Sequence, residues 1–382
     1  MPGLKLGGVD DGVVHVTRGL STGTWGLDRG FERIGSVPGS NVAGRVFDTP
    51  GIGSLLSRVT GSVTTTNLWP IGGDRLLATV GNKLFLSTDR GRSWRLVRQL
   101  PESSGPMGVL PTAVCRHEGR VYLAEYPLGD ETARVLVTDD GQQWSTYVSR
   151  SDVRHFHGLF HDPYTGSLWG TTGDTDDESA IGRFVDGEFR PVGRGSQTWR
   201  AVDLAFTPEA VLWGMDCSYA PQIEILRLSR DDIPSESANS PIDQHSLESV
   251  GQVDGPVFYT ATIQSDRTVW VVLSTASTTG TDSTSSKTDR TGTAPVRVVA
   301  ASRQSGYRRW YQLITAERYR ALGRTVPPIP TANAYAFLAT TPDGSLLINP
   351  FNTRHNHGEV IARRASSFTE APLLSTAVGR SE

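Results

Sequence analysis

The sequence predicts an all-β fold: a six- or seven-bladed β-propeller in which each blade is a four-stranded antiparallel sheet. Three observations predict this fold. Helical periodicity is nearly absent and is found only in residues 315–324. Short runs rich in Val, Leu, Phe, Tyr and Trp alternate with turn residues, among them 41 Gly and 22 Pro, as is typical of all-β proteins. These runs recur in blocks of about 40–45 residues, the length of one blade.

Each block contains a strand, a tight turn, a second strand, a longer connection, a third strand, another turn and a last strand. We therefore expect a single propeller domain over residues 1–382. Residues 1–64 contain further strand-like runs, which either complete a seventh blade or supply a strand that closes the ring. Residues 274–295 are polar and low in complexity, so we expect a flexible insertion there. The six predicted blades span residues 65–100, 109–148, 155–193, 199–250, 254–314 and 330–368.

Composition limits the classes of partner. The net charge of −3 argues against nucleic acid or an anionic membrane as a partner, and no apolar run approaches the roughly 20 residues of a membrane helix. The first residues lack the apolar core of a secretory signal, which predicts a cytoplasmic protein unless it is exported by another route. Cys115 and Cys217 are too few for a disulfide framework. The oligomeric state is left open, and a monomer is compatible with the sequence.

Two turns repeat the same spacing. Residues 87–94 read STDRGRSW and residues 137–144 read VTDDGQQW. We expect the acid to accept backbone N–H bonds, the glycine to adopt a positive φ, and the tryptophan to pack beneath the turn. The residues assigned to these structural turns are Ser87, Asp89, Gly91 and Trp94 in the first, and Asp139, Gly141 and Trp144 in the second.

This spacing resembles the Asp-box, or BNR repeat, S-x-D-x-G-x-x-W, of sialidase-like β-propellers. The resemblance implies a propeller fold, a structural role for the boxed acids and a carbohydrate-active function.

Propeller geometry predicts which segments meet. The starts of the first strands and the loops between second and third strands lie at one mouth of the channel, and the Asp-box turns lie at the other end. Ligand sites open at a mouth where several blades converge, and polar residues gather in those segments of this chain. The predicted catalytic residues are His155, His157, Arg200 and Tyr219, and the predicted substrate-binding residues are Tyr126, Trp199, Asp203, Asp216, Asn352, Arg354, His355 and His357.

These residue types favour an acidic oligo- or polysaccharide as the ligand, and they are similar in type to the sites of propeller polysaccharide lyases. In such a β-elimination, Arg200 would neutralise a uronate carboxylate, His155 or His157 would take the adjacent proton, and Tyr219 would protonate the leaving oxygen. The alternative for Arg200 is a structural pair with Asp203 or Asp216. The alternative is a non-catalytic glycan- or protein-binding propeller. A third hypothesis is a sialidase-like hydrolase, for which Arg33 would be one of three carboxylate-binding arginines.

No cofactor follows with certainty from the sequence, and a divalent metal stays open. His155 and His157 alternate by two, as do His355 and His357, so each pair shares one face of an extended strand. Such pairs suit Zn²⁺ or Mn²⁺. Residues 174–178 have the composition of a Ca²⁺ loop without the EF-hand spacing. The alternatives are that one histidine of each pair hydrogen-bonds to a neighbouring carboxylate or carbonyl, and that residues 174–178 form a solvated acidic turn.

Overall fold

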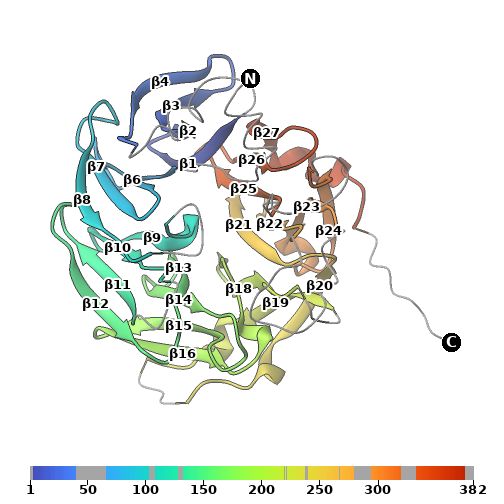
Figure 1. Ribbon diagram of the computed structural model, residues 1–382. Coiled ribbons are helices and arrows are strands. Elements are labelled where there is room, and N and C mark those ends of the chain that lie inside the picture. Colours follow the sequence, from blue (N-terminus) through green and yellow to red (C-terminus); the bar gives the residue numbers. More distant parts are fainter. Residues whose placement is uncertain are drawn as a thin grey trace, which may run out of the picture.

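The chain forms seven antiparallel sheets arranged around a central channel (Figure 1). The structure is a computed structural model, and it describes residues 3–39, 66–102, 108–127, 132–218, 220, 222–236, 240–265, 267–278, 294–319 and 333–374. The all-β propeller prediction is confirmed, and the number of blades is seven. Within the described residues, no helix is long and apolar enough to span a membrane.

Blades 1 to 6 each contain four strands in chain order, with the first innermost and the fourth outermost (Figure 1). The strands of blades 1 to 3 are β1 (Leu4–Asp10), β2 (Val13–Arg18), β3 (Ser21–Gly26) and β4 (Gly30–Ser36); β5 (Asn67–Pro70), β6 (Leu76–Val80), β7 (Lys83–Ser87) and β8 (Arg95–Gln99); and β9 (Val114–His117), β10 (Arg120–Ala124), β11 (Ala133–Thr138) and β12 (Ser145–Arg150).

Blade 7 has three strands among the described residues, followed by the 3₁₀ helix η7 (Ala365–Glu370). The strands of blades 4 to 7 are β13 (Phe156–His161), β14 (Leu168–Thr172), β15 (Ala180–Val185) and β16 (Glu188–Arg194); β17 (Ala205–Phe206), β18 (Ala210–Gly214), β19 (Ile223–Ser229) and β20 (Glu248–Val253); β21 (Val257–Gln264), β22 (Val269–Thr275), β23 (Val296–Ser302) and β24 (Trp310–Ala316); and β25 (Tyr335–Thr340), β26 (Ser345–Phe351) and β27 (Ile361–Arg364).

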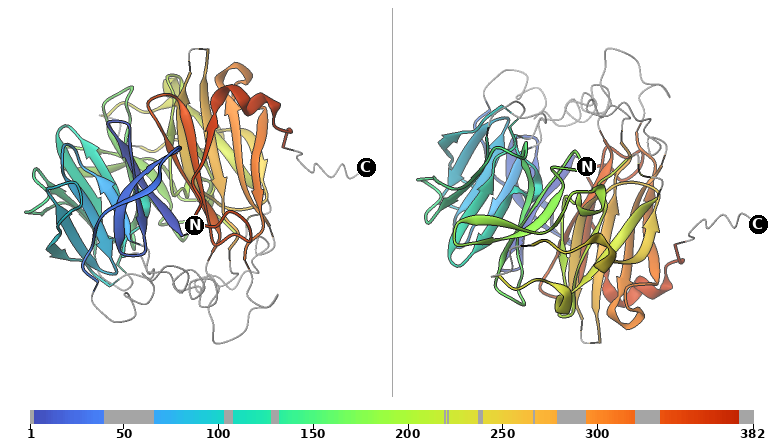
Figure 2. Two further views of the ribbon diagram at one scale, coloured as in Figure 1. Left: turned by 90° about the horizontal axis from the view of Figure 1, so that it is seen from above. Right: turned by 90° about the horizontal axis from the view of Figure 1, so that it is seen from below.

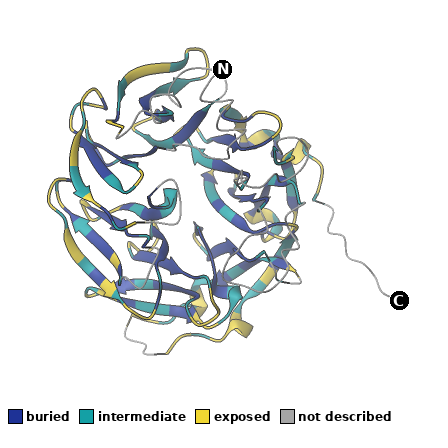
Figure 3. Ribbon diagram, in the orientation of Figure 1, coloured by how far each residue is buried: buried dark blue, intermediate teal, exposed yellow. Residues whose placement is uncertain are grey.

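Burial falls from the middle of each blade to its outer edge (Figure 3). Strand β22, with the sequence VWVVLST, is buried at every residue because neighbouring blades cover both faces of its sheet. Strand β8, with the sequence RLVRQ, is the outer strand of blade 2 and is largely exposed. The apolar runs of the sequence therefore mark middle strands, and the charged runs mark outer strands.

Blade 1 is built entirely from residues near the start of the chain, so residues 1–64 supply a whole blade and not a closing strand. The ring closes through hydrogen bonds between blades 1 and 7. Leu4 N donates to Gly358 O at 2.9 Å. Leu6 N donates to Asn349 Oδ1 at 3.0 Å, and Asn349 Nδ2 donates to Leu4 O at 3.1 Å and to Glu359 O at 2.8 Å. The buried Asn349 side chain therefore joins the two ends of the ring.

The same strand contacts blade 2 on its other side. The Lys5 ammonium group donates to Asn67 Oδ1 and lies 5.2 Å from the centre of the Phe337 ring. Burial lowers the pKa of Lys5 to about 7. Blade 1 is thus linked by polar contacts to both of its neighbours.

The turn after β7 uses the residues that the sequence singled out. Gly91 N donates to Ser87 Oγ at 2.8 Å, Ser93 N donates to Asp89 Oδ1 at 2.9 Å, and Gly91 has a φ of 88°. The Trp94 indole donates to Gly91 O at 3.1 Å. These bonds fix the turn between the third and fourth strands of blade 2.

The turn after β11 is shifted by one residue from the prediction. Gly141 N donates to Thr138 Oγ1 at 2.9 Å, and Gln142 N donates to Asp140 Oδ1 at 2.7 Å. The predicted turn acid, Asp139, is instead an exposed partner of Arg120. The reason is that Val137 stands where a hydroxyl is needed, so the turn is built on Thr138 and the acid two residues after it. Gly141 and Trp144 keep their places, with a φ of 79° and an indole bond of 3.1 Å.

The strands run between two faces of the ring, as the side views show (Figure 2). We call the end of the channel where the first strands begin the upper mouth. The turns after β7 and β11 lie at the opposite, lower end, because each strand reverses the direction of the one before it.

We expect Asn349→Ala to lower the free energy of unfolding by about 3 kcal/mol, because two buried backbone groups, Leu6 N and Leu4 O, and the part-buried Glu359 O lose their partner. Unfolding in urea measures this loss. The control is Gln252→Ala, which removes a surface bond to Gln222 and should change stability by less than about 0.5 kcal/mol. Equal losses in the two variants would contradict closure through Asn349.

We expect Asp140→Ala to lower the urea midpoint more than Asp139→Ala, because only Asp140 holds the turn. Backbone bonds from Gln142 and Gln143 lower the pKa of Asp140. A carboxyl whose folded-state pKa is lowered stabilises above its unfolded pKa and loses that effect as the pH falls through its folded-state pKa. The difference in urea midpoint between the two variants should therefore become smaller as the pH falls. A larger drop in the urea midpoint for Asp139→Ala than for Asp140→Ala would show that Asp139 holds the turn, as the sequence predicts.

Candidate functional site

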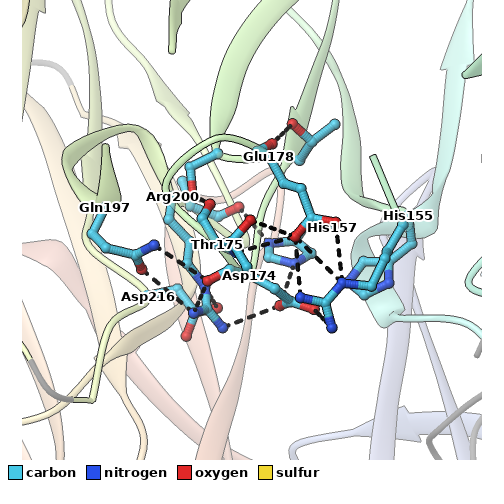
Figure 4. A network of polar contacts seen from close by, with 12 residues as sticks. His155, His157, Asp174, Thr175, Glu178, Gln197, Arg200 and Asp216 are labelled. Carbon is cyan, nitrogen blue, oxygen red and sulfur yellow. Dashed lines mark hydrogen bonds and ion pairs between the residues drawn. The ribbon is translucent and has the colours of Figure 1, made fainter. Parts of the chain in front are cut away.

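Three potential ligand groups meet at the upper mouth (Figure 4). His155 immediately precedes β13, His157 lies in β13, and Asp174 lies in the loop between β14 and β15. His155 Nε2 is 3.4 Å from Asp174 Oδ2, and His157 Nε2 is 3.5 Å from Asp174 Oδ1. Within the described residues, this is the one group of three or more His, Cys, Asp or Glu side chains whose ligand atoms all lie within 4.8 Å of one another. We call it the histidine–aspartate cluster.

The backbone of blade 4 is irregular where it builds this cluster. The pairing of β13 with β14 shifts between Phe156 and Gly158, so His157 is the extra residue of a β-bulge. Bulges re-aim side chains and are frequent beside functional sites. The rings of His155 and His157 lie 5.2 Å apart at 29°, which brings both imidazoles to the same side.

Asp174 is held in an uncommon conformation. Its φ is 107°, a region that residues other than glycine rarely adopt. The preceding Gly173 is required by packing, because a Cβ there would lie 2.6 Å from His157 Cε1 and 3.0 Å from Arg200 Cγ. Backbone strain of this kind concentrates at functional sites, and here it directs a carboxylate toward two histidines.

Arg200 connects blades 4 and 5 beneath the mouth. It follows the 3₁₀ helix η2 (Gln197–Trp199) and is 9 % exposed. Its Nη2 donates to Asp174 Oδ1 at 3.3 Å, its Nη1 donates to Asp174 O at 3.0 Å, and its Nε donates to Asp216 Oδ2 at 3.3 Å. The guanidinium group therefore already binds two carboxylates of the protein.

A second arginine lies on the solvent side of Asp174. Arg154 Nε and Nη2 donate to the two oxygens of Glu178, each at 3.1 Å, and Arg154 Nη1 is 3.6 Å from Asp174 Oδ2. Its side chain is 34 % exposed. Among the described residues, three carboxylates thus face two guanidinium groups, which gives this group of five side chains a net charge of −1 when both imidazoles are neutral.

The histidines differ in their hydrogen bonds. His157 Nδ1 lies 3.2 Å from Ala201 O, and because a carbonyl can only accept, Nδ1 carries the proton. His155 Nδ1 is buried and makes no hydrogen bond to the described residues. The ring of His155 stacks on Tyr126 of blade 3, with centroids 3.8 Å apart.

The charges of the cluster shift two pKa values. Burial lowers the pKa of His155, although the nearby Asp174 carboxylate opposes this shift. Burial alone would raise the pKa of Asp174, but the approach of the His155 and His157 imidazoles outweighs burial and holds it below its ordinary value. Perturbed groups that converge at the mouth of a channel mark a candidate functional site.

The structure separates several predicted site residues from this cluster. Trp199 is 1 % exposed and stacks on Trp213, with centroids 5.5 Å apart, so its ring is blade core and cannot stack on a sugar. Asp203 Oδ2 accepts from Thr260 N of blade 6 at 2.8 Å. It lines a pocket of about 370 Å³ with Tyr164 of the β13–β14 turn, which lies toward the lower end. Tyr219 lies outside the described residues.

The last predicted group belongs to the β26–β27 loop of blade 7, three blades away around the ring. Arg354 pairs with Glu317 at 3.2 Å and is largely exposed. His355 is exposed. His357 Nδ1 accepts from Asn352 N at 2.8 Å. Within the described residues, the second histidine pair therefore has no place in the histidine–aspartate cluster.

The structure also shows where Arg33 and the acidic stretch of residues 174–178 lie. Arg33 lies on β4, the outermost strand of blade 1, so it cannot meet other arginines at the channel as a sialidase-like site would require. Asp176 and Asp177, from the acidic stretch compared with a Ca²⁺ loop, do not join the ligand group.

Glu178 and Gln197 complete the network around Asp174, and the sequence analysis assigned neither. Gln197 Nε2 donates to Asp174 O at 3.2 Å. Glu178 ends the acidic stretch of residues 174–178, which offered a weak signal through its composition. Nothing in the sequence around Gln197 indicates its role.

We expect Arg200→Met to lower the free energy of unfolding by about 3–5 kcal/mol, because Asp174 and Asp216 are left as unpaired, partly buried charges. Arg354→Met, which breaks an exposed pair, should cost less than about 1 kcal/mol. Urea unfolding of both variants measures the difference. A loss below about 1 kcal/mol in Arg200→Met would mean that Arg200 does not stabilise the charges of Asp174 and Asp216.

Comparison with known proteins shows the fold and no family. No family model matches the chain, and no curated protein matches its sequence. Among solved structures, an ancestral GH74 enzyme is similar, with a TM-score of 0.53 and 11 % identity over 98 % of this chain; the match spans 46 % of that enzyme. At this identity the likeness concerns the fold alone.

Two further structures are less similar, with TM-scores below 0.5. YCF48 from Cyanidioschyzon merolae has a TM-score of 0.48 and 13 % identity, over 92 % of each chain. A soluble aldose sugar dehydrogenase from Escherichia coli has a TM-score of 0.41 and 11 % identity, over 72 % of this chain and 96 % of its own. The resemblance to Asp-box, sialidase-like propellers stays a prediction.

Proposed function

We propose that this protein binds an acidic saccharide at the upper mouth, over the histidine–aspartate cluster. The observation that carries the proposal is the convergence of two histidines, a strained aspartate and two arginines from blades 4 and 5, with Tyr126 of blade 3 beside them. Propellers bind ligands where blades converge at a channel mouth. The cluster occupies such a place.

We assign the binding of a ligand carboxylate to Arg154 in place of Arg200. Arg200 is buried and already donates to Asp174 and Asp216. Arg154 is more exposed and holds Glu178 at the rim of the site. Its Nε and Nη2 donate to Glu178 and its Nη1 lies 3.6 Å from Asp174, so a ligand carboxylate would take the place of Glu178 on this guanidinium group. Tyr126 adds an aromatic ring next to His155, which suits contact with a sugar.

Eliminative cleavage is the finer form of this proposal. In that reaction a base takes the proton next to the uronate carboxylate, a C=C bond forms, the C–O bond to the leaving sugar breaks, and the leaving oxygen takes up a proton. Burial favours a neutral His155, as a base requires. Because Arg200 is engaged and the proposed acid Tyr219 lies outside the described residues, binding is the part of the proposal that the geometry supports best.

The test compares uronic-acid oligosaccharides with neutral glucans by isothermal titration calorimetry. We expect tighter binding of the acidic oligosaccharides, and we expect Arg154→Gln to weaken it by about tenfold, the cost of one charge-assisted hydrogen bond. The control is Arg303→Gln, since Arg303 pairs with Glu209 far from the mouth. Ultraviolet absorbance of the unsaturated product in the same samples tests for elimination. Equal affinity for both glycan classes would refute the preference for acidic saccharides.

A further inference from the structure

We propose that the histidine–aspartate cluster is a binding site for a first-row divalent metal ion, held by His155 Nε2, His157 Nε2 and the Asp174 carboxylate. The open coordination position would face the upper mouth. The metal site stands on geometry alone. Its link to a saccharide rests on the proposed function.

The spacing of the three groups fits a metal better than hydrogen bonds. The two N···O distances are 3.4 and 3.5 Å, longer than the roughly 2.7–3.2 Å of an N–H···O bond. Zn²⁺ bound tetrahedrally to nitrogen and oxygen has bonds of about 2.1 Å, which places its ligand atoms about 3.4 Å from one another. Each imidazole thus lies at about this separation from one oxygen of Asp174, His155 from Oδ2 and His157 from Oδ1. The three ligand atoms together lie within 4.8 Å of one another, so small side-chain shifts would bring them around one ion.

The tautomer of His157 also requires a cation between its ring and Asp174. Ala201 O fixes the proton on Nδ1, so in the neutral ring the lone pair of Nε2 faces Asp174 Oδ1. Two acceptors then oppose each other, which is unfavourable unless a proton or a metal ion lies between them. Metal-binding histidines characteristically donate their other N–H to a carbonyl or carboxylate, as His157 does.

His155 supplies an independent observation. The residue is 5 % exposed, and both of its buried ring nitrogens lack a hydrogen bond to the described residues. A buried polar atom without a partner costs free energy, and native proteins rarely leave one. A metal on Nε2 would satisfy the nitrogen that points toward Asp174.

The surrounding charges allow a cation. Glu178 and Asp216 neutralise the two arginines that touch Asp174, and one negative charge remains for the site as a whole. Arg200 and Arg154 hold the Asp174 oxygens in place, as outer groups commonly orient metal ligands. A divalent ion would change the local charge from negative to positive, so an acidic ligand would then be attracted to the mouth.

The donor set indicates the class of metal. Two imidazole nitrogens and one carboxylate suit Zn²⁺, Co²⁺ and Mn²⁺, whereas Ca²⁺ prefers a shell of oxygen ligands. Three protein ligands leave at least one position for water or for an oxygen of the ligand. Metal on Nε2 also uses the lone pair that a histidine base needs, so this inference favours saccharide binding over elimination by these histidines.

The experiment uses the full chain after treatment with a chelator. Calorimetry with Zn²⁺, and the visible absorption of added Co²⁺, should give one bound ion per chain. We expect Asp174→Asn and His157→Ala each to weaken Zn²⁺ binding by at least about 100-fold, since each removes a ligand. Asp174→Asn nearly preserves shape, and its urea midpoint checks that the fold is kept.

Two controls exclude other histidines. His245→Ala removes an exposed histidine and should leave Zn²⁺ binding unchanged. His161→Ala removes half of a separate pair, in which His117 Nδ1 and His161 Nδ1 lie 3.1 Å apart at the lower end of blades 3 and 4. Zn²⁺ binding that is absent, that is lost in His161→Ala, or that persists in Asp174→Asn and His157→Ala would overturn the inference.

The link to the proposed function is tested separately. Titration of uronic-acid oligosaccharides with and without Zn²⁺ should show at least tenfold tighter binding with the ion. If Zn²⁺ binds and the oligosaccharides do not, the proposed function fails and the metal site stands. If the oligosaccharides bind equally well without Zn²⁺, the open coordination position is refuted as their point of attachment.

Discussion

A sheet of three or four short strands cannot cover both of its own faces, and this constraint governs the whole molecule. Each blade hides its apolar faces only when it has a neighbour on either side, so the sheets are stable as a ring and not as a row. Strand β22, buried at every residue, is an example of a segment that needs two neighbours. The channel mouth, and every residue that meets there, depends on that closure.

Closure of the ring depends on a few polar side chains that form hydrogen bonds between blades. Asn349 binds backbone groups of β1, and within the described part of the chain blades 1 and 7 share no strand. At the upper mouth, Arg200 likewise forms ion pairs with Asp174 of blade 4 and Asp216 of blade 5. In both places a single buried polar group spans a seam between sheets, where regular backbone pairing is not available. The candidate site is therefore also part of the structure that keeps adjacent blades in register.

The sequence predicted features that depend on local pattern. Alternating strands and repeated turns indicate a propeller, and the two-residue spacing of His155 and His157 correctly placed their rings together. Features that depend on one-residue register or on long-range partners were not predictable. Asp139 and Asp140 are adjacent acids, and only the position of the Thr138 hydroxyl decides which one holds the turn. For Arg200, the residues left open both a ligand carboxylate and a structural pair with Asp203 or Asp216, and the structure shows the pair with Asp216.

The position of a residue along a strand does not fix its angle around the ring, so the sequence could not predict which residues at the upper mouth lie close together. His357 and His155 both lie near the upper ends of inner or connecting segments, yet their blades are three apart. Trp199 lies next to Arg200 but turns into the core beside Trp213. Glu178 and Gln197 acquire their roles only through the path of the Asp174 loop, which no local pattern encodes.

The absence of a shared strand between the first and last blades has a topological consequence. Each described sheet is made from one continuous stretch of chain, and the backbone at Leu4 already touches that at Gly358. The last described residue, Leu374, lies against blade 6, where its N–H donates to Trp310 O. A linker from Leu374 to Leu4, with a cut in the connection between two other blades, would leave all seven sheets whole. The protein is therefore suited to circular permutation, and the histidine–aspartate cluster could be moved from the middle of the polypeptide toward either terminus without changing its neighbours in space.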